Sequence, residues 1–144
     1  MTIHLLRMAV RVESISHLKR IQVERLRERV KRGESGLYTF TRNIPKRVDN
    51  LIDGGSIYWI IKKYIRARQR ILGVERHVDG EGRPYCAIQI DPEPIQVVVR
   101  RQKAFQGWRY LKPDDIPLDL DISERQVTDM PTEMADELRE LGLI

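Results

Sequence analysis

The first fifty residues carry the clearest pattern of apolar and polar positions. Between Thr2 and Val12 the apolar residues come close to alternating, which predicts an opening β-strand. Ser14 can cap a helix through its hydroxyl, and the apolar residues after it recur on one face at about 100° per residue. These residues are Ile15, Leu18, Val23, Leu26 and Val30. The pattern therefore predicts an amphipathic helix over residues 14–32.

Shorter elements are predicted further along the chain. A short helix is expected to reach Ile52, with Pro45 in its first turn. Aromatic and β-branched residues bounded by turn residues predict strands at 37–41, 85–90 and 95–99. In the last of these strands, Ile95, Val97 and Val99 are expected to point inward. The aromatic segment 105–111 fits either a closing strand or a loop.

Residues 56–74 fit two different structures. One helix would gather most of their apolar residues on one face, but it would also place Arg68 within that face. Two strands would require a tight turn at Lys62-Lys63, which is a poor sequence for such a turn. Periodicity alone favours the helix slightly and does not decide the question.

Charge divides the chain into two unequal parts. Residues 1–112 carry 24 of the 26 Lys and Arg residues and 11 of the 21 Asp and Glu residues, a net charge of +13. Residues 113–144 carry a net charge of −8. We expect one domain over residues 1–144, with a basic α+β body (1–112) followed by an acidic part. That part comprises a connector at 113–122 and a C-terminal helix over 131–141.

The bulk composition favours a folded protein of a reducing compartment. At 41% hydrophobic and 33% charged residues the chain is too apolar for a disordered one. Cys86 is the only cysteine, so no disulfide can form within the chain. Neither a signal-peptide pattern nor an apolar stretch of roughly 18 residues is found. We therefore expect a cytoplasmic protein with no membrane contact.

The basic body raises the hypothesis of a polyanionic partner. If residues 65–71 form a strand, Arg66, Arg68 and Arg70 lie on one face about 6.6 Å apart, near the phosphate repeat of an extended nucleic acid. The alternative is an edge strand that is charged to deter aggregation. For the whole basic body, the alternative is that its charged face only keeps the protein soluble.

Two further groups of residues combine cations with aromatic rings or a helix start. Aromatic rings interleaved with cations are typical of surfaces that bind single strands, although the same rings could belong to the core. Cations near a helix start could bind phosphate, or could simply be solvated. The first group is Trp108, Arg109, Tyr110 and Lys112, together with Arg100, Arg101 and Lys103. The second is Arg42, Lys46 and Arg47.

Signals for catalysis are weak. His4, His17 and His77 are scattered without metal-ligand spacing, and Cys86 alternates within an apolar segment. No nucleophile motif is found. We therefore expect a binding protein rather than an enzyme, with no catalytic residue, no metal and no cofactor.

Four short segments resemble a small alphaproteobacterial family known only as domain of unknown function 1489. The segments are residues 41–47 (TRNIPKR), 54–59 (GGSIYW), 68–72 (RQRIL) and 105–111 (FQGWRYL). The resemblance covers most of the chain and implies no activity.

Part of the chain also resembles, more loosely, PUA-like domains of the ASCH and EVE groups. The resemblance covers Thr41-Arg42 and residues 45–52, 55–61 and 65–74, while Ser56 replaces an acidic residue common in those domains. It implies strands at 56–74 and binding of RNA or a nucleobase. A possible pocket would involve Thr41, Tyr58 and Trp59, whereas an ASCH-like hydrolase pocket would lie around Thr41, Lys46 and Tyr58.

We therefore expect an α+β fold in which a small PUA-like β-barrel or a strongly bent mixed sheet is flanked by an N-terminal and a C-terminal helix. The leading functional hypothesis is non-catalytic binding of RNA or a nucleobase. The alternatives are a small ASCH-like hydrolase of nucleoside or amide substrates, and a structural or regulatory protein that binds other proteins.

Overall fold

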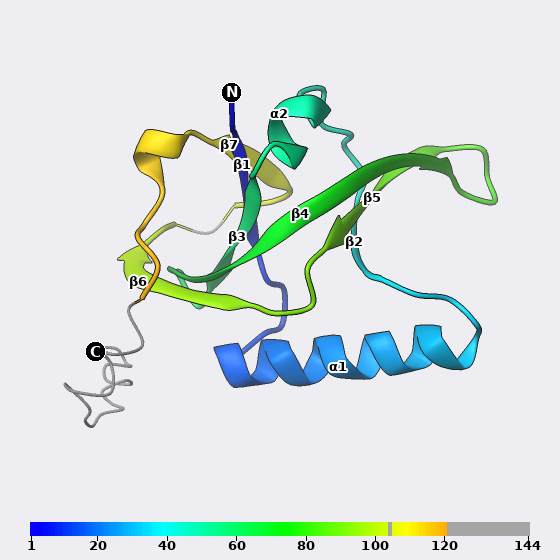
Figure 1. Cartoon of the computed structure of the whole chain (residues 1–144), viewed down its shortest axis with the longest axis horizontal. Helices are drawn as coiled ribbons and strands as arrows, with labels where there is room; N and C mark the ends of the chain where they lie inside the picture. The colour runs from blue at the N-terminus through cyan, green and yellow to red at the C-terminus, as the bar shows by residue number, and fades with distance from the viewer. Residues whose placement is uncertain (104, 121–144) are drawn as a thin grey trace.

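The structure is a computed structural model that describes residues 1–103 and 105–120. The helix predicted over residues 131–141 lies outside the described residues. Two helices and seven strands follow one another within the described residues (Figure 1). They are β1 (His4–Met8), α1 (Ile15–Lys31), β2 (Leu37–Thr41), α2 (Val48–Ile52), β3 (Ser56–Ile61), β4 (Tyr64–Val78), β5 (Pro84–Ile90), β6 (Ile95–Arg101) and β7 (Trp108–Leu111), followed by a 3-10 turn at Pro113–Asp115.

The strands form one mixed sheet in the order β2-β5-β4-β3-β1-β7, and β6 also pairs with β4. β1 and β3 run parallel, and the other paired strands run antiparallel. The first half of the 15-residue β4 pairs with β3 and β6, while its second half pairs with β5. The predicted α+β class with a mixed sheet is confirmed. The sheet is not closed, so the structure gives no barrel.

The helix predicted after Ser14 is confirmed as α1. The Ser14 hydroxyl oxygen accepts a hydrogen bond from the backbone N–H of His17 at 3.1 Å, which satisfies one of the free amides of the first turn. Leu18 and Gln22 are the buried residues of this helix, and Ile15 and Leu26 pack against the core. Val23 and Val30, expected on the same face, are 49% and 62% exposed, because the buried side of the helix is centred nearer Gln22. In Figure 1, α1 lies across one side of the sheet, and α2 lies near the opposite end of the molecule.

Residues 56–74 form strands, so the helix that periodicity slightly favoured is not formed. β3 and β4 are joined by the tight turn at Lys62-Lys63, where both residues have left-handed backbone angles (φ of 51° and 71°). Such angles are costly for residues with a Cβ atom. Two contacts support the turn: Lys62 Nζ lies 2.6 Å from Glu13 Oε1, and the backbone N–H of Gln102 donates to the Lys63 carbonyl at 2.8 Å.

Two local predictions are wrong, both for tertiary reasons. Pro45 does not lie in the first turn of the short helix, because the next two backbone N–H groups donate to the Tyr110 hydroxyl and α2 begins only at Val48. In β6 only Val97 is buried, while Val99 is exposed. The pairing of β4 with β6 contains a register shift between Ile65 and Ala67, which is typical of a β-bulge and disturbs the expected alternation.

Buried apolar residues form two clusters. The larger one includes Leu5, Ile57 and Trp59, and Leu18 of α1 packs within it. The smaller one comprises Leu6, Tyr58, Ile60, Ile65 and Val97, and is covered by Phe105, Leu111 and Ile116. Consecutive residues of β1 and of β3 thus belong to different clusters, so the central strands are buried on both faces.

Among the described residues, neither helix has the length and apolar character that crossing a membrane requires.

Candidate nucleic-acid interface

The predicted cations of β4 lie on the side of the strand away from its most buried residues. From Ile65 to Ile71, buried residues alternate with Arg66, Arg68 and Arg70, as expected for a strand. Arg68 lies opposite Tyr58 in the register with β3, and Arg70 lies opposite Ser56. The structure therefore brings these three cations to one strand face.

Arg68 is already occupied by partners from the protein itself. Its Nε and Nη2 atoms donate to the two carboxylate oxygens of Asp119, both at 2.7 Å, and its Nη1 donates to the Ser56 hydroxyl at 2.9 Å. The hydrogen bond to Asp119 raises the pKa of Arg68. Arg66 instead stacks over the ring of Tyr64, at 5.1 Å from its centroid. Of these three arginines of β4, only Arg70 is exposed and has no charged partner in the described part of the chain.

Next to Arg68 lies a buried polar cluster that the sequence did not reveal. The His4 Nδ1 atom accepts a hydrogen bond from the Ser56 backbone N–H at 3.0 Å, and its ring meets the Tyr58 ring edge-on at 5.4 Å. Burial, and then the charge of Arg68, lower the pKa of His4, while burial raises the pKa of Tyr58 to about 12. His4 and Tyr58 are therefore both neutral near pH 7. Their contacts connect β1 with β3.

Trp108 and Tyr110 hold a loop against β7. Trp108 Nε1 donates to the Asn43 carbonyl at 3.0 Å, and the Tyr110 hydroxyl accepts the backbone N–H groups of Lys46 and Arg47 at 3.0 and 3.1 Å. Both rings also pack against the larger cluster. These contacts favour the structural alternative for the two rings over a surface for bases.

The remaining predicted cations are dispersed. Arg42 lies beside the end of the β4–β5 hairpin, where its Nη1 atom is 3.3 Å from Asp79 Oδ2. Arg47 and Arg109 stack on the rings of Tyr110 and Phe105, with their Cζ atoms 5.8 and 4.2 Å from the ring centroids. The side chains of Lys46 and Lys112 are exposed. The register places Arg109 opposite Leu6, Leu6 opposite Tyr58 and Tyr58 opposite Arg68, so Arg109 lies on the same sheet face as Arg68, with β1 and β3 between them.

The residues of the possible pocket do not come together. Tyr58 and Trp59 are consecutive residues of β3, and they belong to the smaller and the larger cluster respectively. Thr41 ends β2, where its hydroxyl donates to the Asn43 carbonyl at 2.8 Å. A shared site for Thr41, Tyr58 and Trp59 is therefore absent from this fold.

A row of four aromatic rings lies on the outer face of β2, β5 and β4. Tyr38 stacks on Phe40 at 6.4 Å between ring centroids, Phe40 meets Tyr85 at 6.0 Å, and Tyr85 stacks on His77 at 5.5 Å. We call these residues the aromatic row. The strand register explains it, because Phe40 lies opposite Ala87 and His77 lies opposite Tyr85.

The aromatic row is open to solvent and supported from one end. The Phe40 side chain is 53% exposed, although the neighbouring residues of β2 are buried. The guanidinium of Arg29 covers the ring of Tyr38 at 4.7 Å from its centroid, and it is held there by hydrogen bonds to the carbonyls of Ser35 and Gly36. At the other end, His77 Nε2 lies 2.9 Å from Glu75 Oε1.

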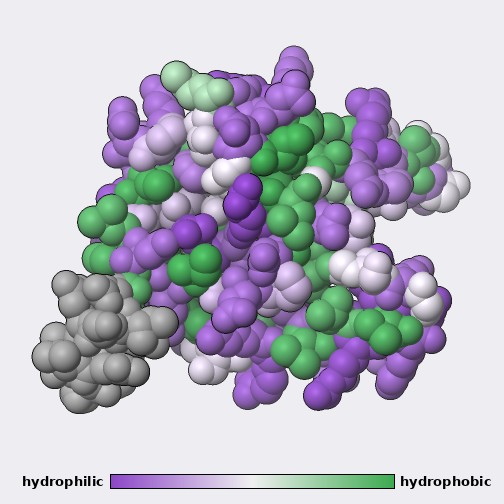
Figure 2. All heavy atoms as spheres, viewed as in Figure 1, coloured by the Kyte–Doolittle hydropathy of each residue, from purple (hydrophilic) through white to green (hydrophobic). Residues whose placement is uncertain are grey.

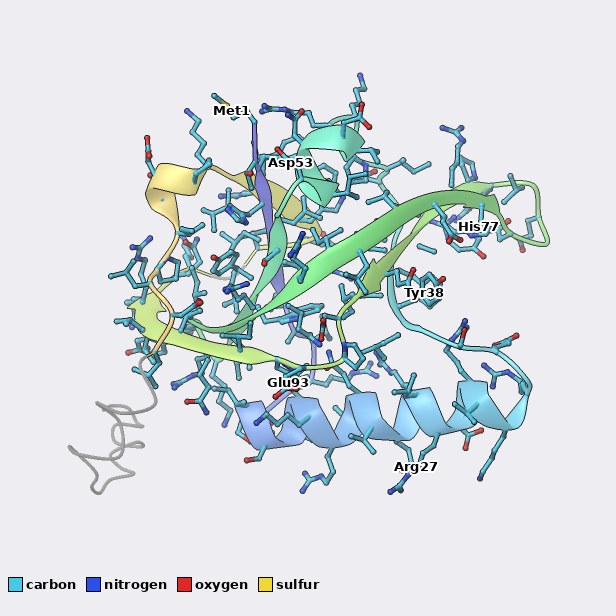
Figure 3. All side chains as sticks on the ribbon, viewed as in Figure 1. Met1, Arg27, Tyr38, Asp53, His77 and Glu93 are labelled. Carbon is cyan, nitrogen blue, oxygen red and sulfur yellow. The ribbon has the colours of Figure 1, made fainter. Side chains whose placement is uncertain are left out.

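The surface is hollowed between the β4–β5 hairpin and the C-terminal half of α1. Figure 2 shows this recess at the right edge of the molecule, and Figure 3 shows Tyr38 and His77 on the same side of the sheet. A cleft of about 150 Å³ lies between α1 and the sheet, and Tyr38 contributes to its lining. The aromatic row and the cleft thus share one residue.

The aromatic row was missed at the level of the sequence, although half of its signal is present there. The alternation in β2 places Tyr38 and Phe40 on one face and Leu37 and Thr39 on the other. The pairing of β2 with β5, however, cannot be read from the pattern. Without it, Tyr85 and His77 have no connection to β2.

The described residues give little support for catalysis or metal binding. Within residues 1–103 and 105–120, no three His, Cys, Asp or Glu side chains converge as a metal site. Burial raises the pKa of the Cys86 thiol, which makes it a poor nucleophile.

Comparison with known proteins places the chain in one family. No curated protein and no solved structure matches it. The family model described as "Protein of unknown function (DUF1489)" matches residues 5–144, which is nearly the whole chain. The chain therefore belongs to the DUF1489 family of proteins of unknown function.

Proposed function

We propose that this protein binds single-stranded nucleic acid, RNA in preference to DNA, without catalysis, and that bases stack on the aromatic row. The observation that carries the proposal is the continuous line of four rings on one open sheet face. Stacking of a base on an aromatic side chain contributes about 1–3 kcal/mol and tolerates any base. Aromatic rings on a sheet surface are a recurrent means of binding single-stranded RNA.

The solvent exposure of the aromatic row supports the proposal that a ligand binds there. A phenylalanine on a sheet face gains stability when it is covered, yet Phe40 remains 53% exposed beside two tyrosines. The alternative is a ladder of cross-strand pairs that only strengthens β2 at the edge of the sheet. The two possibilities differ in what a truncation changes: affinity for RNA in the first case, and stability alone in the second.

The charge of the protein supports the same partner. Residues 1–112 carry a net charge of +13, which favours the approach of a polyanion. Arg42 lies close to the Tyr85 end of the row, because its Nη1 atom also donates to the carbonyl of Pro84 at 3.1 Å. Arg29 is fixed by its carbonyl partners, so it holds the ring of Tyr38 in place and leaves phosphate contacts to other cations.

The preference for RNA rests on the loose resemblance to PUA-like domains, which commonly bind RNA. The closed barrel of those domains is not part of this support, because the sheet of this protein is open.

The proposal is tested by fluorescence anisotropy with labelled RNA of about 12 nucleotides. We expect a single strand to bind more tightly than a duplex of the same sequence, because only unpaired bases can stack. If about four phosphates are contacted, the slope of log affinity against log salt is about −3. Equal affinity for single strand and duplex, or no binding of any single strand at low salt, would contradict the proposal.

A further inference from the structure

The cleft between α1 and the sheet has a polar wall and an apolar wall. Its volume is about 150 Å³, and its apolar lining includes Leu18, Ile21 and Ile90. Gln22 belongs to a closed network in which its amide exchanges two hydrogen bonds with that of Gln69, at 2.7 and 2.8 Å. Trp59 Nε1 completes the network by donating to Gln69 Oε1 at 2.8 Å. The network is satisfied within the protein and forms a fixed wall.

Arg7 is a polar group of the cleft that lies outside this network. It projects from β1 and is half-buried, and its Nη1 atom donates to the Thr39 hydroxyl at 2.7 Å. In the part of the chain that the structure describes, no other side chain or carbonyl is hydrogen-bonded to this guanidinium, and no carboxylate forms an ion pair with it. A guanidinium has five N–H donors, so most of its donors are left for a ligand.

A second cation, Arg25 of α1, lines the same cleft. Burial, and then the charge of Arg25, lower the pKa of Arg7, so the two charges repel each other across the cleft. A half-buried positive charge without an anion is unfavourable, and a like charge nearby makes it more so. A bound anion would remove both costs.

We propose that Arg7 and Arg25 bind a phosphate group, and that this is the terminal phosphate of a nucleic-acid strand lying on the aromatic row. Two arginines suit phosphate because each can form bidentate hydrogen bonds. Tyr38 lines the cleft and begins the row. Because Thr39, the partner of Arg7, lies on the face of β2 opposite to the row, the nucleic-acid strand would pass around β2, which is the edge strand, to place its end in the cleft. The assignment to a strand end rests on the proposed function, whereas the anion site itself does not.

The size of the cleft explains why an end of the strand is required. A cavity of about 150 Å³ holds a molecule of the size of benzene, which is smaller than a nucleoside. A phosphate group fits this volume. An internal phosphate would not, because the nucleotides on both sides of it would clash with the residues that line the cleft. The same chemistry could serve free phosphate, and the experiment separates the two sources.

The test uses the full chain and three RNA single strands of one sequence, with a 5′-phosphate, a 3′-phosphate or only hydroxyl ends. We expect one of the phosphorylated strands to bind about 10-fold to 100-fold more tightly than the hydroxyl strand, as for hydrogen bonds to a charged group. Arg25→Gln should abolish this gain. Arg27→Gln should retain it, because Arg27 lies on the same helix and points away from the sheet (Figure 3). Arg7→Gln should act like Arg25→Gln.

A second measurement separates the anion site from strand binding. Inorganic phosphate, compared with chloride at equal ionic strength, should raise the Tm of the wild type and of Arg27→Gln, but not that of Arg25→Gln. Phosphate stabilisation without a preference for strand ends would overturn the terminal-phosphate assignment and point to a free phosphate ligand. If phosphate has no effect on the Tm and all three strands bind equally, the anion site is refuted while the proposed function stands.

Discussion

Arg68 and Asp119 form a bidentate ion pair across 51 residues of sequence, with Nε–Oδ1 and Nη2–Oδ2 distances of 2.7 Å. Asp119 is held in place by its neighbours, because Leu118 and Leu120 form backbone hydrogen bonds with β6 at 2.7 and 2.9 Å. The acidic connector predicted from the sequence therefore covers one of the cations of β4. This contact has consequences for stability and for polyanion binding.

The first prediction concerns stability against pH. The hydrogen bond from Arg68, together with its charge, lowers the pKa of Asp119 below the ordinary value of 3.8. The pair therefore stabilises the fold fully above about pH 5, and this contribution is lost as the pH falls through the lowered pKa. At pH 7, Asp119→Asn should decrease the free energy of unfolding by about 1 kcal/mol, because solvent screens the half-exposed carboxylate.

The measurement is urea denaturation of wild type and Asp119→Asn at pH 7 and near pH 3. The difference between the two proteins should shrink at the lower pH. A difference of the same size at both pH values would show that the ionised pair is not its source.

The second prediction concerns the cations of β4, which we propose as a further phosphate-binding surface. Asp119→Asn releases the guanidinium of Arg68 and should increase affinity for single-stranded RNA several-fold at low salt, with a smaller gain at high salt. Asp114→Asn is the matched control, since it removes the same charge from the exposed 3-10 turn. If the two variants have equal effects, only the change in net charge matters. If the affinity of Asp119→Asn is unchanged, Asp119 does not compete with RNA for Arg68.

The third prediction separates a structural ring from a binding ring. Trp108 is half-buried and its indole N–H is bonded to the Asn43 carbonyl, so Trp108→Ala should decrease the free energy of unfolding by about 2–3 kcal/mol. RNA affinity of the folded variant should remain unchanged. Thermal unfolding and an anisotropy titration below the Tm measure the two effects. A loss of affinity with little loss of stability would restore Trp108 as a surface for bases.

Local chemistry explains what the sequence predicted correctly. The Ser14 cap of α1 is an interaction within a few residues, and the alternation around Arg66 and Arg68 follows from the geometry of a strand. The sequence predicts the buried face of α1 only in part, because Val23 and Val30 are exposed and Gln22 is buried. The start of α2 differs from the prediction because Tyr110, more than sixty residues away, accepts hydrogen bonds from the amides that would otherwise begin the helix. Propensity cannot include such a contact.

The candidate site depended almost entirely on pairing between distant segments. The aromatic row requires the register of β2, β5 and β4, and the anion site requires α1 to lie beside Arg7. The sequence identified a basic protein and a strand at β2, but the aromatic residues it emphasised, Trp108 and Tyr110, hold a loop. Outward-facing rings become informative only when their neighbours across the sheet are known.

The fourth prediction tests the junction of α2 with β3. Gly55 has no Cβ atom, and one placed there would lie 2.2 Å from the Ile3 carbonyl oxygen and 2.3 Å from that of Leu51. Gly55→Ala should therefore destabilise the fold by several kcal/mol, since backbone and not a flexible side chain is in the way. Gly80→Ala is the control, because nothing lies within 4 Å of its Cβ position. A Gly55→Ala protein as stable as the control would contradict the close approach of Gly55 to the carbonyl groups of Ile3 and Leu51.

The most direct test of the account is the RNA affinity of Phe40→Ala compared with that of Val99→Ala. The two side chains are equally exposed, at 53% and 51%, but Phe40 lies in the aromatic row and Val99 lies on β6. We predict that Phe40→Ala weakens binding of single-stranded RNA by about 1–3 kcal/mol with little change in Tm, and that Val99→Ala leaves the affinity unchanged. Equal affinities of the two variants and the wild type, or a loss in Phe40→Ala explained by a lower Tm, would show that the row is a structural ladder and not a binding surface.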